Sequence, residues 1–290
     1  MPKSYNELSF IDDFMFCKIL STNPDLTKEL LEIILDINIL EIRFPEPQKT
    51  IEITADGRGI RLDVYVESDS DNAADGNHKN VYDIEMQTRL KNDLAKRSRY
   101  YQGMIDLNLI ERNAEFVELK KSYVIFICLD DPFKEGRHIY TFENRCIQDT
   151  NIALNDETFK VFLNPKGHTD DVSPELGDFL KYLASGTVNS DFTKRLDSQV
   201  ESAKMKEQWR LEYMTLYMRD RDIFEDGKAE GMLQGKAEGI LQGKAEGLLQ
   251  GKSEAVISMY KKGRITIEEA ADELNISVDE FIKLATHEES

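Results

Sequence analysis

Two acidic residues and an amide stand at every second position of the segment VYDIEMQTR, residues 81–89, and this pattern could support metal chemistry. The segment is typical of a β-strand, because β-branched and aromatic residues alternate with polar ones. One face carries Asp83, Glu85 and Gln87, while the positions between them are apolar. Packing in a hydrophobic core does not explain two carboxylates and an amide on one face of a strand.

A further carboxylate lies one strand earlier, in RLDVYVE, residues 61–67. Alternation predicts that Leu62 and Val64 share the core face and that Asp63 lies on the opposite face. If the two strands pair, Asp63 approaches Glu85, since adjacent strands lie about 4.8 Å apart. Oxygen ligands suit Mg²⁺ or Mn²⁺ rather than zinc. The solvent-facing side of a half-exposed sheet is the alternative interpretation, and spacing alone does not decide between them.

A basic segment follows the carboxylate strand. A helix is predicted from about Leu90 to Asn113, and it is cationic in a chain whose formal net charge is -18. We expect its cations to contact nucleic-acid phosphates. They are Arg89, Lys91, Lys96, Arg97 and Arg99. Tyr100 and Tyr101 beside them fit either core packing or contact with a sugar or base.

Composition narrows the class of protein. The net charge of -18 argues against a protein that coats nucleic acid non-specifically. Cys17, Cys128 and Cys146 stand in apolar contexts, and we expect buried thiols in a reducing compartment. The sequence has neither a run of about 20 apolar residues nor a secretory signal. We therefore expect a cytoplasmic protein without a membrane segment.

The order of elements predicts an α/β fold. Two helical runs separated by Pro24 come first. A strand is expected at residues 51–56, followed by a turn at Asp56-Gly57 and a second strand at 59–68. Further strands are expected at 81–87, 122–130, 138–142 and 159–163. The run at 122–130 is apolar enough for a buried strand. A polar hairpin loop is expected over residues 68–80 and a helix over 173–185.

Four segments in order resemble the PD-(D/E)XK nuclease superfamily, and within it the Rpn group of recombination-promoting nucleases, which are also named transposases. They are FIDDFMFCKIL at 10–20, RLDVYVES at 61–68, YDIEMQTR at 82–89 and RSRYYQGM at 97–104. The resemblance covers roughly residues 1–200. It implies a restriction-endonuclease-like core, a mixed sheet flanked by helices, and DNA cleavage that depends on Mg²⁺ or Mn²⁺.

The resemblance also assigns roles to residues. Asp63 and Glu85 would bind the metal, and Gln87 would complete the catalytic set where the superfamily usually has lysine. A glutamine can orient water by hydrogen bonds but adds no charge. We therefore expect slow cleavage that depends mainly on the metal for charge stabilisation. Asp13 would add an outer carboxylate, with helix capping by Asp12 or Asp13 as the alternative.

An octapeptide repeat dominates the C-terminal part: GKAEGMLQ, GKAEGILQ, GKAEGLLQ and GKSEAVIS begin at Gly227, Gly235, Gly243 and Gly251. Eight residues rotate a helix by about 80° beyond whole turns, which excludes a heptad coiled coil. Two glycines per unit predict a marginal, mobile helix or linker. The alternative is a helix that packs on a partner through its glycines.

The last residues predict a helical hairpin. Thr266 and Glu269 fit a capping box, and Asn275 fits a helix end. The spacing is close to a helix-turn-helix. Asp279 and Glu280 at the start of its second helix disfavour contact with phosphates, so packing or protein contact is expected there.

These observations predict a nuclease-like core followed by a long helical arm. The expected parts are the nuclease-like domain at 1–190, a charged helical connector at 191–226, the repeats at 227–258 and the hairpin at 259–290. The leading hypothesis is a DNA endonuclease that hydrolyses phosphodiesters, since no DDE-type triad for strand transfer is visible. The alternative is a weak or inactive nuclease fold that binds DNA or protein. The arm could form homo-oligomers or restrain the nuclease within one chain.

Overall fold

The computed structural model of the chain describes residues 3–44, 50–51, 59–69, 79–89, 91–110 and 113–287. The chain divides into two compact units, Met1–Met214 and Thr215–Ser290. The first unit contains the sheet and the helices around it. The second contains most of a long helix and a helical hairpin.

A mixed sheet forms the centre of the first unit. In the described part of the chain it has six strands in the order β1-β4-β5-β6-β8-β7. The strands are β1 (Ile42–Arg43), β4 (Val64–Asp69), β5 (Lys79–Gln87), β6 (Ser122–Cys128), β7 (Ile139–Phe142) and β8 (Thr158–Leu163). β5 pairs antiparallel with β4 and parallel with β6, and β6 pairs parallel with β8. The antiparallel pairing of the two carboxylate-bearing strands is therefore confirmed.

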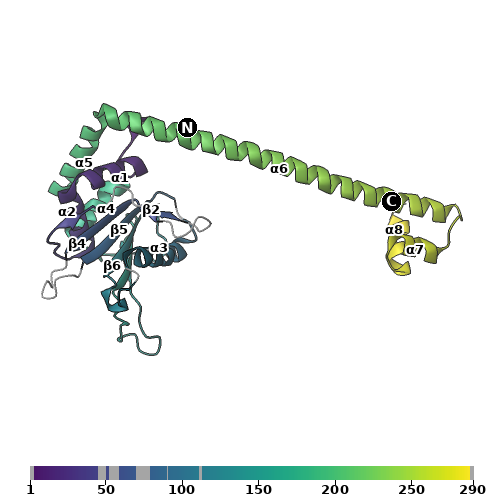
Figure 1. The fold of residues 1–290 in the computed structure, drawn as a ribbon, viewed down its shortest axis with the longest axis horizontal. Coiled ribbons are helices and arrows are strands. Elements are labelled where there is room, and N and C mark those ends of the chain that lie inside the picture. Colours follow the sequence, from purple (N-terminus) through teal and green to yellow (C-terminus); the bar gives the residue numbers. More distant parts are fainter. Residues whose placement is uncertain are drawn as a thin grey trace. The chain divides into compact units, whose positions relative to one another are not determined.

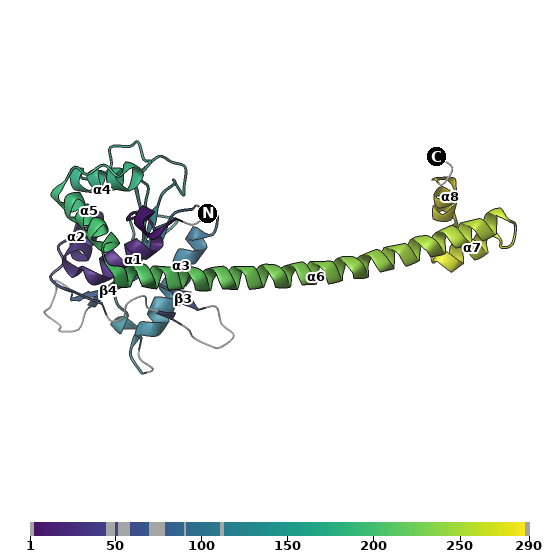
Figure 2. The same cartoon turned by 90° about the horizontal axis from the view of Figure 1, so that it is seen from above.

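Helices cover both faces of this sheet. One face packs against α1 (Asp13–Thr22), α2 (Pro24–Leu35), α4 (Pro174–Ser185) and α5 (Asp191–Lys204). The other face packs against α3 (Leu94–Leu109). The sheet lies between these two groups in Figure 1, and Figure 2 shows α2, α4 and α5 beside one another. Every residue of β6 is buried, as expected for a strand with neighbours on both edges and helices on both faces.

The strand expected at residues 59–68 is interrupted. β3 (Ile60–Arg61) pairs with β2 (Thr50–Ile51) in a separate two-stranded ladder. β4 starts only after Leu62 and Asp63. Leu62 packs in the core beside α3, whereas Val64 packs in the core on the opposite face. The prediction that Leu62 and Val64 share a face is wrong, because the strict alternation breaks between the two strands.

The basic helix is shorter than expected. α3 begins at Leu94, with Asp93 at the N-cap position, and it ends at Leu109 rather than near Asn113. Leu90, the predicted start, lies outside the described residues. The same holds for the predicted Asp56-Gly57 turn, for most of the predicted strand at 51–56, and for residues 70–78 of the predicted loop.

The first unit extends beyond residue 190. Leu196 and Val200 of α5 are buried in the main core, and the Tyr5 hydroxyl donates a hydrogen bond to the Ala203 carbonyl over 2.7 Å. Tyr213, near the start of α6 (Glu207–Lys261), packs against Tyr5, and its hydroxyl donates a hydrogen bond to the Lys3 carbonyl. The charged connector therefore contributes to the core of the first unit.

The octapeptide repeats are helical throughout α6. Their period places a glutamine four residues before the glutamate of the next unit. Gln234, Gln242 and Gln250 accordingly donate amide hydrogen bonds of 2.8 to 2.9 Å to the following glutamates. Such pairs support an exposed helix by about 0.2 to 0.5 kcal/mol each. The repeat is thus a helix whose side-chain bonds partly offset its glycines.

Replacing Gly231, Gly239 and Gly247 together with alanine should stabilise α6 by about 1 kcal/mol per site. A β-carbon added at each position meets no described atom within 4 Å. Circular dichroism should show a higher melting midpoint, and light scattering should show an unchanged mass. Replacing Ala229 with glycine is the reciprocal control and should lower the midpoint. A fall in mass on alanine substitution would instead support glycine-mediated packing on a partner.

A small helical hairpin closes the second unit. α7 (Ile267–Leu274) and α8 (Val278–His287) enclose Phe281 in a core with Val256 and Ile257 of α6. The Thr266–Glu269 capping box and the left-handed Asn275 at the end of α7 confirm both sequence predictions.

Candidate active site

The interruption before β4 positions Asp63 against β5. The Asp63 backbone N–H donates to Glu85 Oε1 over 2.9 Å, and the Met86 N–H donates to Asp63 Oδ2 over 3.1 Å. The antiparallel register sets this contact: Val64 pairs with Ile84, so Asp63, one residue earlier, lies beside Glu85. The structure therefore brings together the two carboxylates that the sequence singled out.

Burial disfavours the charged forms of these carboxylates. It raises the pKa of Asp63 to about 7, with the charge of Asp13 adding to the effect. It raises the pKa of Glu85 to about 8, with the charge of Asp63 adding to the effect. Glu85 is only 2% exposed. A site that holds several carboxylates so closely is one that a cation would stabilise.

Asp83 is buried deeper than either of them. Its carboxylate oxygens accept no hydrogen bond from any described residue. Burial raises its pKa, and the charges of Glu85 and Asp63 raise it further. We assign Asp83 no role at this site.

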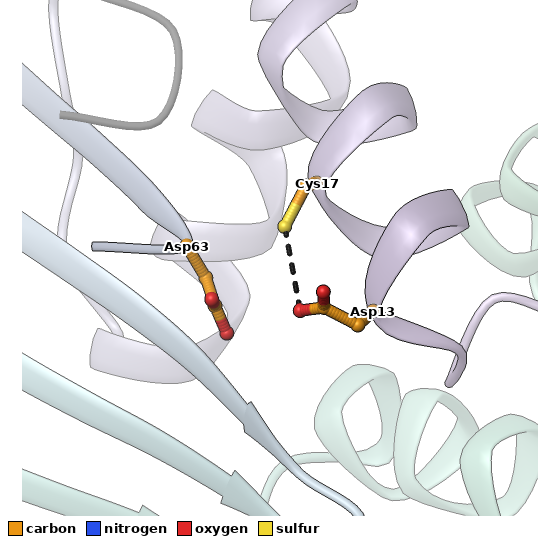
Figure 3. A group of neighbouring side chains, drawn as sticks. All are labelled: Asp13, Cys17 and Asp63. Atoms are coloured by element: carbon orange, nitrogen blue, oxygen red, sulfur yellow. Dashed lines mark hydrogen bonds between the residues drawn. The ribbon is translucent and has the colours of Figure 1, made fainter. Parts of the chain in front are cut away.

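α1 contributes two further side chains to the same place. The Cys17 thiol donates a long hydrogen bond to Asp13 Oδ1, over 3.8 Å. One ligand atom each from Asp13, Cys17 and Asp63 lie within 4.8 Å of one another. Figure 3 shows the two α1 side chains directed toward Asp63. Asp12, rather than Asp13, occupies the N-cap position, and its carboxylate binds Lys3 and the Ser9 N–H.

Arg97 reaches into the site from α3. Its Nη1 donates to Gln87 Oε1 over 2.9 Å, and its Nη2 donates to the Tyr101 hydroxyl over 3.0 Å. Nη2 also lies 3.6 Å from Glu85 Oε2. The guanidinium stands over the rings of Tyr101 and Phe126. One half-buried cation is thus held between β5 and α3.

Two adjoining cavities contain the site and the predicted nucleic-acid-binding cations. The first, of about 430 Å³, contains Asp13, Asp63 and Glu85, with Arg89 and Lys91 in its wall. The second, of about 600 Å³, has Lys96, Arg99, Tyr100 and Tyr101 in its wall. Arg61 and Arg97 line both cavities. The five predicted cations therefore all face one or both of these hollows.

The donor set fits a hard divalent cation. Asp63 and Asp13 offer carboxylate oxygens, which Mg²⁺ and Mn²⁺ prefer. Glu85 offers another beside Asp63, outside the group of ligand atoms that Asp13, Cys17 and Asp63 form. Cys17 adds a sulfur that would favour a softer ion only if the thiol lost its proton. Asp63 and Glu85, whose pKa values burial raises, supply negative charge that such an ion neutralises.

The sequence analysis did not place Cys17 or Arg61 at this site, and it left Tyr101 open between core packing and contact with a sugar or base. Cys17 lies four residues after Asp13, and Tyr101 lies four residues after Arg97, so each pair shares one helix face. That spacing could have identified both residues. Arg61 lacked any such signal, because its position depends on the interruption that follows it.

One comparison with known proteins gives a match. A family model described as PD-(D/E)XK nuclease family transposase matches residues 10–226. Searches of curated proteins and of solved structures found no match. The mixed sheet flanked by helices and the long helix after it agree with the fold that the sequence predicted. In the described part of the chain, no helix has the length and apolar character needed to cross a membrane.

Proposed function

The chain belongs to the PD-(D/E)XK nuclease family transposases, and from that premise we propose that it is a divalent-metal-dependent DNA endonuclease. The observation that carries the proposal is the mutual hydrogen bonding of the Asp63 and Glu85 segments inside a cavity rimmed by cations. Carboxylates for a metal and cations for phosphates are the two parts that phosphodiester hydrolysis requires.

We propose that Asp63 and Glu85 hold the metal, with Asp13 as a further ligand or a ligand to its waters. Mg²⁺, or Mn²⁺ in its place, is the proposed ion because the donors are oxygen atoms. When bound, the ion supplies positive charge that offsets the charge developing on the phosphate and lowers the pKa of water. Asp63 and Glu85 would hold it through their ionised carboxylates.

The cations of the two cavities have a separate part in this proposal. Arg89 and Lys91 at the first cavity, and Lys96 and Arg99 at the second, would contact backbone phosphates on either side of the scissile bond. Such contacts position a strand without reading its sequence. Tyr100 is exposed at the second cavity, where it could stack on a base.

Replacing Asp63 with alanine should reduce cleavage of supercoiled plasmid by at least about 100-fold, because one metal ligand is lost. Gel separation of supercoiled, nicked and linear plasmid, with Mg²⁺ present, measures the effect. Asp170, an exposed acid outside both cavities, provides the control as Asp170→Ala. Equal cleavage by the Asp63→Ala variant and the wild type would contradict the assignment.

An inactive nuclease fold that binds DNA or protein is the second candidate. One observation favours it: the apolar pairs Met232-Leu233, Ile240-Leu241 and Leu248-Leu249 on α6 are exposed. Such pairs suit assembly with another chain or a restraint on the nuclease. Retention of DNA without any strand breaks would favour this candidate.

We also propose a place for the activity. The three cysteines are free thiols, which suits a reducing cytoplasm. Strand breaks made there would provide starting points for DNA recombination.

A further inference from the structure

We infer that Arg97 is the fixed cation of the catalytic centre, and that Gln87 holds Arg97 in place. This inference rests on the proposed nuclease function and deepens it. In this inference the positive charge of the site comes from α3, instead of from a lysine on β5 at the position of Gln87.

The hydrogen bonds of Gln87 leave it little freedom. Its Nε2 donates to the Met86 carbonyl over 3.1 Å, and its Oε1 accepts from Arg97 Nη1 over 2.9 Å. The side chain is buried. Both ends of the amide therefore engage protein atoms, which fixes its orientation with the carbonyl oxygen on Arg97.

Arg97 is held on several sides. Gln87 and the Tyr101 hydroxyl accept from its two terminal nitrogens, while Glu85 lies at ion-pair distance. The Tyr101 and Phe126 rings lie 5.3 and 5.5 Å from the guanidinium carbon. These contacts leave the side chain 19% exposed, and it still lines the cavity that contains the carboxylates.

The other cations at this cavity differ from Arg97 in burial. Arg61, Arg89 and Lys91 are exposed. A cation that is already oriented needs no reorganisation when negative charge develops on a phosphate, so it stabilises the transition state more than a mobile surface cation does. Arg97 is the described cation that combines this fixed position with contact to Glu85.

The competing explanation is structural: Arg97 only neutralises Glu85. Four variants separate the two explanations: Arg97→Gln, Arg97→Lys, Gln87→Ala, and Arg97→Gln combined with Gln87→Lys. The combined variant places an ammonium next to the position that the guanidinium left, because the two side chains touch in the wild type.

Plasmid cleavage at saturating Mg²⁺ provides the first readout. Arg97→Gln should lower kcat about 100-fold with little change in KM for DNA. Arg97→Lys should lower kcat less, by about 10-fold, because it keeps the charge but loses the guanidinium geometry. Gln87→Ala should lower kcat about 10-fold, because Arg97 loses the hydrogen bond that positions it. The combined variant should recover at least about 10-fold over Arg97→Gln, since it restores charge. Lys181→Gln, on the exposed side of α4, removes one cation elsewhere and should leave cleavage unchanged.

Calorimetric titration with Mn²⁺, without DNA, provides a readout that is independent of cleavage. Arg97→Gln should bind Mn²⁺ as tightly as the wild type or more tightly, because a cation beside the ligands has gone. Weaker Mn²⁺ binding would mean that Arg97 only keeps Glu85 in place, and would overturn the inference. Unchanged kcat in Arg97→Gln, or no recovery in the combined variant, would overturn it as well.

The outcomes also separate this inference from the nuclease proposal. Cleavage by the wild type together with equal cleavage by Arg97→Gln overturns only the role of Arg97. A wild-type protein that cleaves nothing with Mg²⁺ or Mn²⁺ overturns both.

Discussion

Glu85→Gln should abolish DNA cleavage and at the same time stabilise the metal-free protein near pH 8. The cleavage loss, at least about 100-fold, follows from removing a ligand charge. The gain in stability follows because Glu85 is buried among other carboxylates, and its pKa of about 8 shows that its charged form is disfavoured there. A neutral amide of similar shape keeps the hydrogen bond from the Asp63 N–H and removes the repulsion.

Two measurements on the same preparation check this prediction. Denaturant unfolding in EDTA at pH 8 gives the free energy of unfolding, and plasmid cleavage in Mg²⁺ gives the activity. Glu135→Gln removes one exposed carboxylate away from both cavities and should change neither quantity. If Glu85→Gln destabilised the metal-free protein, the crowding of carboxylates inferred for this site would be wrong.

The metal-free protein should become less stable as pH rises from about 4 to about 8. Asp63 and Glu85 have pKa values of about 7 and about 8 in the folded chain, against about 4 when unfolded. In this window the folded chain keeps protons that the unfolded chain has released, so raising the pH favours unfolding. Each unit of pKa difference corresponds to about 1.4 kcal/mol, and coupling between the groups reduces the sum.

Mn²⁺ should reverse this trend, because it binds the deprotonated carboxylates and stabilises the folded chain. Unfolding curves at pH 6.0, 7.0 and 8.5, with EDTA and with Mn²⁺, measure the effect. The Asp63→Asn, Glu85→Gln double variant separates the contribution of the site from that of the other 53 acidic residues, and it should lose most of the difference between EDTA and Mn²⁺. Identical pH profiles for the double variant and the wild type would contradict the prediction.

Several strands and helix ends were predictable because their signals are local. The apolar run of β6, the alternation along β5, and the caps at Ser173 and Thr266 each depend on residues next to one another. The octapeptide period excluded a heptad seam, and it also fixed the glutamine–glutamate pairs along α6. Local signals of this kind act before tertiary contacts form, so the sequence alone reveals them.

The details of the site depended on tertiary contacts. The interruption at Leu62 breaks an alternation that the sequence presents as continuous, and it aims the following residue, Asp63, at α1. Arg97 belongs to a basic segment, but which of its cations turns inward depends on how α3 packs on β6. The resemblance to nucleases marked Gln87 as the residue without a charge. The contact with Arg97 adds that the charge is present nearby.

Cleavage of supercoiled plasmid by the wild-type full chain, with Mg²⁺ and then with excess chelator, tests the central claim most directly. Asp63 and Glu85 lie together in a cavity rimmed by cations, so nicked and linear plasmid should appear with Mg²⁺ and stop accumulating once the chelator is added. A folded protein that retains plasmid in a gel-shift assay but makes no strand breaks with Mg²⁺ or Mn²⁺ would contradict the account.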